Sequence, residues 1–174
     1  MNFFSLRSAV KDILGQGLLL LDRVNDETYA RPNQGVYSAS IGAHYRHVLD
    51  HFLCLSNSIR TRVVNYDHRE RNPELENSSS YARFVTEQLM EEFSALEEAA
   101  FRASCSVTYS VGYDGDEPSE VPSNLARELM FCVGHAIHHF AILKLLCAAV
   151  AIPLPYEFGI APSTLKHNEA QSAH

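Results

Sequence analysis

The sequence predicts an all-α protein, an antiparallel four-helix bundle with a small β-hairpin between the third and fourth helices. Four long stretches repeat apolar residues at the three-and-four spacing of one helix face. Polar links with proline, asparagine or serine separate these stretches. The 174 residues, 46% hydrophobic and 20% charged, have the length and composition of one globular domain. We therefore expect a single domain over residues 1–165 and a disordered tail over residues 166–174.

The first two helices are predicted from about Phe3 to Val24 and from about Ser40 to Val64. Either Ser38 or Ser40 can cap the second, because a serine oxygen accepts an amide of the first helical turn. Residues 65–73 between the second and third helices are charged and aperiodic, which predicts a loop. The inner face of the second helix is Ile41, His44, Val48, Phe52, Leu55 and Ile59.

The third helix is predicted from just after residues 78–80 to about Ser104. Its acidic residues are expected to face solvent: Glu87, Glu91, Glu92, Glu97 and Glu98. Residues 106–111 and 120–122 have the character of two antiparallel strands, and residues 114–116 supply the turn between them.

The fourth helix is predicted from a Ser123 cap to about Val150, where Pro153 and Pro155 prevent its continuation. Residues 158–165 are expected to be irregular and to pack on the helices. The zinc-protease motif is absent, because Ala136 stands where that motif has a glutamate. The motif of di-iron bundles is also absent, because no helix histidine follows a glutamate by three residues.

The charge and the start of the chain argue for a cytoplasmic protein. The net charge of −7 argues against nucleic acid and anionic membranes as partners. Residues 1–7 lack the features of a signal peptide, and the longest apolar runs, 18–21 and 145–152, are shorter than the ~20 residues of a membrane span. Four cysteines without a C-x-x-C pair predict reduced thiols.

Histidines are concentrated on two helices, the second with His44, His47 and His51, and the fourth with His135, His138 and His139. His135 and His139 are four positions apart, so their rings can bind one ion. Several buried imidazoles on facing helices would repel one another if protonated, whereas a divalent cation binds them in the neutral form. His138 lies on the side away from the apolar stripe, and His68, His167 and His174 are expected in solvent. A metal-free bundle with histidines lining a pocket is the alternative.

These residues resemble the motifs of the DinB-like superfamily, which includes the YfiT-type metalloenzymes. The resemblance covers residues 3–150 and rests on Ser40–His47 of the second helix and His135–His139 of the fourth. It implies a four-helix bundle with one metal ion per chain (zinc, nickel or iron), bound by His47, His135 and His139. The family often has an acidic residue where this chain has Phe52. By helical angle, His44 and His51 lie nearer the apolar stripe than His47, so His51 is an alternative ligand. His44 and His138 are further candidates for an alternative or supporting role.

The resemblance also implies functions. Relatives include thiol-dependent transferases, so we expect an enzyme of transferase or hydrolase type whose metal activates a thiol or water and whose substrate is a small molecule, such as a low-molecular-weight thiol. Homodimers are common in the family. A non-enzymatic, stress-associated bundle with a structural or sensing metal is the alternative. Candidates for orienting a substrate are Asp67, Arg69 and Arg71, and Asp50 is a candidate to support a ligand histidine.

Overall fold

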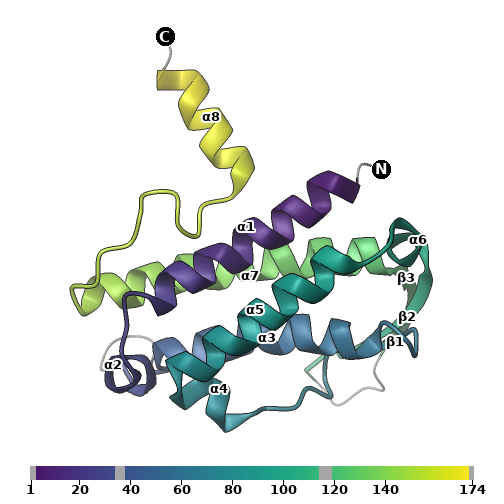
Figure 1. Ribbon diagram of the computed structural model, residues 1–174, viewed down its shortest axis with the longest axis horizontal. Helices are drawn as coiled ribbons and strands as arrows, with labels where there is room; N and C mark the ends of the chain where they lie inside the picture. Colours follow the sequence, from purple (N-terminus) through teal and green to yellow (C-terminus); the bar gives the residue numbers. More distant parts are fainter. Residues whose placement is uncertain (1–2, 34–37, 114–118, 173–174) are drawn as a thin grey trace.

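The computed structural model describes residues 3–33, 38–113 and 119–172, and it is mostly helical with a small three-stranded sheet (Figure 1). The longest helices of the described part are α1 (Phe3–Leu21), α3 (Ile41–Ser58), α5 (Ser79–Ala95) and α7 (Leu125–Ala149). Each of them contacts two of the others, α1 and α3 both packing against α5 and α7. The buried apolar side chains of all four form one core.

Short helices occupy two of the links between the predicted long helices. They are α2 (Asp26–Ala30) and α4 (Pro73–Asn77). Asn25 accepts a hydrogen bond from the amide of Thr28, and Asn72 accepts one from the amide of Glu74, so each helix has an asparagine cap. Five residues are too few to show helical periodicity, and for this reason the pattern did not reveal them.

The predicted hairpin is confirmed, and a third strand joins it. β2 (Ser104–Tyr109) pairs antiparallel with β3 (Ser119–Asn124), and the turn predicted at residues 114–116 lies outside the described residues. β1 (Val63–Asn65) pairs parallel with β2, giving the order β1-β2-β3. The prediction had placed Val64 at the end of the second helix, whereas α3 ends at Ser58 and the chain then enters the sheet.

Two helix boundaries differ from the prediction. The expected third helix is divided into α5 and α6 (Glu98–Arg102), because Leu96 and Glu97 adopt extended backbone conformations. Asn124, rather than Ser123, caps α7 by accepting the amide of Arg127. The Ser123 hydroxyl instead donates to the Glu128 carboxylate.

The tail is more ordered than predicted. Residues Pro162–Ser172 form α8, which stands away from the other helices in Figure 1 and has no buried residue. This helix covers most of the segment that was expected to be disordered and part of the one expected to be irregular; residues 173–174 lie outside the description. The expected packing on the helices is seen at Phe158, whose ring stacks on that of Phe140 with 5.1 Å between centroids.

Among the described residues, α7 is the one helix whose length and composition would allow it to cross a membrane. The core helix of a soluble protein meets the same criterion, and α7 packs against α1 and α3.

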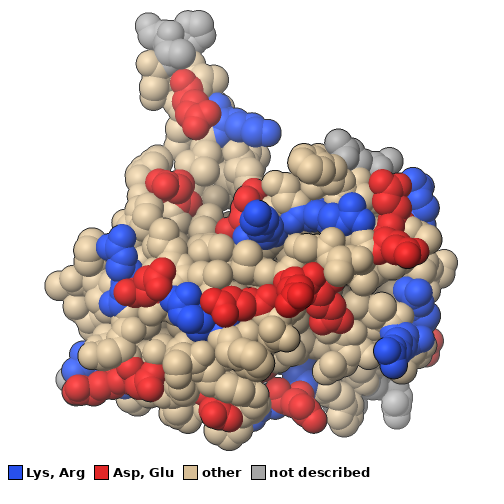
Figure 2. All heavy atoms as spheres, viewed as in Figure 1, with Lys and Arg blue, Asp and Glu red and all other residues tan. Residues whose placement is uncertain are grey.

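The predicted acidic face of the third helix is confirmed. All five of its glutamates are exposed, on α5, α6 and the link between them. On the face drawn in Figure 2, acidic and basic side chains lie intermixed rather than in separate patches. One example is Arg83 of α5, which pairs with Asp22 and with Glu87.

Gly42 sets the close approach of α3 to α4. A Cβ atom at this position would lie 2.0 Å from the carbonyl oxygen of Glu76 and 2.8 Å from the ring of Tyr29. No such contact is tolerated, so a larger residue would force the two helices apart. Gly134 on α7 is the contrasting case, because nothing lies within 4 Å of a Cβ built there.

We expect Gly42→Ala to lower the free energy of unfolding by about 1–3 kcal/mol, because the methyl group overlaps the backbone of α4. Gly134→Ala is the matched control and should raise it by about 0.5–1 kcal/mol, since alanine favours an exposed helix interior. Urea denaturation of the three proteins measures both changes. Equal stabilities for the two variants would contradict the close helix contact.

Candidate metal centre

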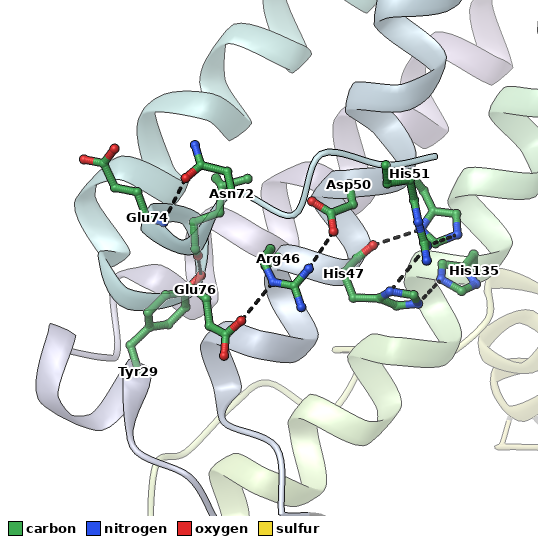
Figure 3. Close-up of polar contacts among 11 residues, drawn as sticks. Tyr29, Arg46, His47, Asp50, His51, Asn72, Glu74, Glu76 and His135 are labelled. Atoms are coloured by element: carbon green, nitrogen blue, oxygen red, sulfur yellow. Dashed lines mark hydrogen bonds and ion pairs between the residues drawn. The ribbon is translucent and has the colours of Figure 1, made fainter. Parts of the chain in front are cut away.

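Three histidine rings from two helices meet where α3 packs against α7. The ligand nitrogens of His47, His135 and His139 all lie within 4.8 Å of one another. The Nε2 atoms of His47 and His135 are 3.1 Å apart. These rings are half-buried, and Figure 3 shows His47 and His135 facing each other across the two helices.

The helix registers that produce this meeting follow from the sequence. Ser40 caps α3 by accepting the amide of Ala43, which fixes where the helix begins. Val48 and Phe52 of α3 are buried, as are Ala136 and Phe140 of α7. The histidines adjoin these core positions, so they are carried to the rim of the helix interface rather than to its centre.

His51 lies against the cluster but outside the group of three. Its side chain is buried, and its Nδ1–H donates to the carbonyl of His47 at 2.8 Å. Its ring centroid is 4.0 Å from that of His135, and the ring stacks on Tyr66. The Nδ1 bond leaves Nε2 of His51 without a proton in the neutral ring.

The remaining histidines are placed differently from one another. Nδ1 of His44 lies 3.3 Å from Nδ1 of His139, so Nε2 is the nitrogen of His139 left to bind an ion. His138, His68 and His167 are exposed, as the sequence predicted, and His174 lies outside the described residues.

Asp50 forms a buried ion pair one turn from His47, visible in Figure 3. Its Oδ2 accepts from Arg46 at 2.8 Å, and Arg46 also donates to Glu76 at 2.9 Å. Burial raises the pKa of Asp50, while Arg46, Arg69 and Arg71 act in the opposite direction. Asp50 is therefore paired with Arg46, and none of its hydrogen bonds in the described structure is with a histidine ring.

The three candidates for orienting a substrate have different surroundings. Asp67 accepts two hydrogen bonds of 2.8 Å from Ser110, one from its amide and one from its hydroxyl, so it ties the segment after β1 to the end of β2. Arg71 is exposed. Arg69 is half-buried and reaches the histidines: one guanidinium nitrogen lies 3.0 Å from Nε2 of His51 and 3.5 Å from Nδ1 of His47.

A buried acid next to the cluster had not been predicted. Glu128, 1% exposed, accepts hydrogen bonds from Tyr66 at 3.0 Å, from Ser123 and from Arg127. The signal that would have revealed it is a charged residue on the apolar face of α7, three positions after Leu125. Through Tyr66, this carboxylate supports the ring that stacks on His51.

The cluster is a group of neutral imidazoles. Burial lowers the pKa of His47 to about 3, and of His51, His135 and His139 to about 4. Repulsion among the rings adds to the shift, and so does the Arg69 guanidinium at His47, His51 and His135. Rings without a proton on one nitrogen have the lone pair that a metal ion requires.

The comparisons with known proteins bear on the fold. No family model matches the chain. A curated relative, FK506-binding protein 5 of Rhizopus delemar, is 29% identical over 117 residues, which are 67% of this chain. The chain spans only 30% of that relative's length. The crystal structure of a DinB-like protein, YjoA of Bacillus subtilis, superposes with a TM-score of 0.63 and 15% identity, covering 88% of this chain and 97% of the other. The chain therefore has the DinB-like fold.

We expect the metal-free protein to lose stability as the pH falls from about 6.5 towards about 4. The ordinary histidine pKa is 6.5, so the unfolded chain takes up protons in this range while the folded cluster does not. Above pH 6.5 the histidines are neutral in both the folded and the unfolded chain, so they cause no further change of stability with pH. Burial also lowers the pKa of His44, which adds to the trend. Asp50, with its raised pKa, opposes it, but five histidines outweigh one carboxyl.

Thermal melts of chelator-treated protein between pH 7.5 and 4.5 measure this loss. His51→Gln should make the curve shallower, because it removes one of the five groups. A melting temperature that stays constant over the whole range would contradict the neutral cluster.

Proposed function

We propose that α1, α3, α5 and α7 form an antiparallel four-helix bundle that binds one divalent metal ion through His47, His135 and His139. The observation that carries the proposal is the 3.1 Å separation of the two Nε2 atoms, with the third ring close by. Metal–nitrogen bonds of about 2.0–2.1 Å place two ligands of one ion roughly 2.9–3.4 Å apart, for bond angles of about 90–109°. The Nε2 atoms of His47 and His135 are thus spaced as two ligands of one ion, and a donor nitrogen of His139 lies within 4.8 Å of them.

Three neutral imidazoles suit zinc, nickel or iron(II), and they leave a coordination position for another ligand. The DinB-like fold is consistent with such a site. The interaction of His44 with Nδ1 of His139 supports it further, because a ligand histidine usually has its other ring nitrogen engaged.

We propose an enzyme of transferase or hydrolase type. A bound ion would supply Lewis acidity, lowering the pKa of a thiol or water at its open position. The chain's own residues would hold the rings neutral and orient them, with His51 and Arg69 closing one side of the cluster. The proposed substrate is a small molecule, such as a low-molecular-weight thiol, and the proposed setting is a cytoplasmic homodimer.

One observation favours a second function, a structural or sensing metal site. His51 has a buried ring. Its centroid lies 4.8 Å from the ring centroid of His47 and 4.0 Å from that of His135. As a fourth ligand it would close the site, and a closed site holds its metal without binding substrate. Whether removal of His51 releases the metal separates the two functions.

We expect His47→Ala, His135→Ala and His139→Ala each to weaken zinc or nickel binding by at least about 10-fold, because each removes one of three donors. His138→Ala is the matched control on the same helix and should bind metal as the natural chain does, since that ring is exposed. Calorimetric titration of untagged, metal-stripped protein measures the affinities.

In the open-site function, His51→Ala keeps the metal; in the structural function, it loses metal as readily as His47→Ala. Natural protein that takes up no zinc or nickel, and whose melting temperature does not rise when either is added, would contradict the metal site itself.

A further inference from the structure

Arg69 is a half-buried cation that makes no close ion pair with a carboxylate of the described residues, although the Asp50 carboxylate acts on it at longer range. It takes part in none of the ion pairs found among the described residues. Its guanidinium nitrogen lies 3.2 Å from Nδ1 and 3.0 Å from Nε2 of His51. Two nearly equal distances mean that the nitrogen contacts the ring as a whole, rather than one lone pair. Its Nε is buried and has no hydrogen-bond partner in the described structure.

This placement is unfavourable without an anion. A half-buried guanidinium loses part of its hydration, and a neutral imidazole returns only part of the lost stabilisation. A divalent ion at the neighbouring histidines would add repulsion between like charges. A negatively charged group next to Arg69 would relieve both effects.

A cavity of about 360 Å³ lies beside Arg69. That volume suits a small molecule. Arg69 lines the cavity and also contacts His51 and His47, so it separates the cavity from the histidine cluster. The rest of the lining includes polar residues such as Asn65 and Asn72, and also the exposed carboxylate of Glu70.

Asp50 gives the cavity a second unsatisfied group. This side chain is 2% exposed and lines the same cavity. Arg46 binds its Oδ2, whereas Oδ1 has no hydrogen-bond partner among the described residues. A buried carboxylate oxygen without a donor is destabilising, and a donor on a bound molecule would correct it.

We propose that this cavity binds a small carboxylic acid that also carries an amino or hydroxyl group, with the carboxylate on Arg69 and the amino or hydroxyl donor on Asp50. The proposal deepens the proposed function by naming a substrate class, and it rests on that function for the adjacent metal. Arg69 would hold the carboxylate one side chain away from the histidines. Charge-assisted pairing of guanidinium with carboxylate is among the stronger polar contacts in proteins.

Three probes separate the two contacts: L-serine has both groups, propionate has only the carboxylate, and ethanolamine lacks the carboxylate. Each probe is titrated into cobalt-loaded protein, and the heat of binding is measured by calorimetry. In a second experiment, each probe is added to the metal-free protein, and the shifts of its amide signals are followed by solution NMR. We expect L-serine to bind more tightly than either of the others.

Arg69→Gln should weaken L-serine and propionate by about 10-fold or more and leave ethanolamine unchanged. Arg71→Gln, an exposed arginine two positions away in the same segment, is the matched control and should change none of them. Asp50→Asn should weaken L-serine but not propionate. Circular dichroism of each variant checks that it folds.

Equal binding of L-serine by the two arginine variants would overturn the proposal, as would a preference for ethanolamine. A crystal structure in which Arg69 pairs directly with Asp50, in place of any ligand, would overturn it too. A different result would contradict the proposed metal site alone. In that case the protein takes up no cobalt, but L-serine still shifts the amide signals of the metal-free protein.

Discussion

The contact between α3 and α7 is the interaction on which the rest of the site depends. Neither helix alone brings three histidine nitrogens together, and the rings of His47 and His135 meet because α3 and α7 pack against each other, with Val48 and Ala136 buried next to the histidines in sequence. The sheet reinforces this contact at one end. β1 follows α3 and β3 leads directly into α7, so hydrogen bonds through β2 tie the two helices to each other.

Electrostatics around the cluster follow from where the acids are held. The buried carboxylates of the described residues belong to Asp50 and Glu128, and each has its own partners. Arg46 binds Asp50, while Tyr66, Ser123 and Arg127 bind Glu128. Among the described residues, neither carboxylate makes a hydrogen bond or a close ion pair with the histidine rings or with Arg69. The cluster therefore consists of neutral rings beside one cation, an environment that favours anions over cations among small ligands.

The sequence predicted the long helices and the hairpin because these depend on local periodicity and on turn residues. It also named His47, His135 and His139, the three that the structure brings together. Helical angle alone had favoured His44 and His51, and both lie beside the group of three, His44 against His139 and His51 against His135. The apolar stripe of α3 serves the core with α5 as well as the contact with α7, so its centre does not point at the histidines of α7.

What the sequence did not predict depends on contacts between distant segments. The strand at residues 63–65 gains its hydrogen bonds only from β2, some forty positions later, and three residues carry no alternation of their own. Glu128 is stable in the interior only because Tyr66 and Ser123 reach it. The sequence offered Arg69 as one of three charged candidates in a predicted loop. Only the folded structure shows that it is the one in contact with the histidine rings.

The pairing of His47 with His135 has a consequence for how the protein folds. The two residues are 88 positions apart in the chain. Such a pair closes a long loop, which costs chain entropy, so we expect it to form late in the folding reaction. An ion held between the rings would then act as a late, reversible cross-link. It would leave the rate of folding almost unchanged and would slow the separation of α3 from α7, so the lifetime of the folded chain would depend on the supply of metal.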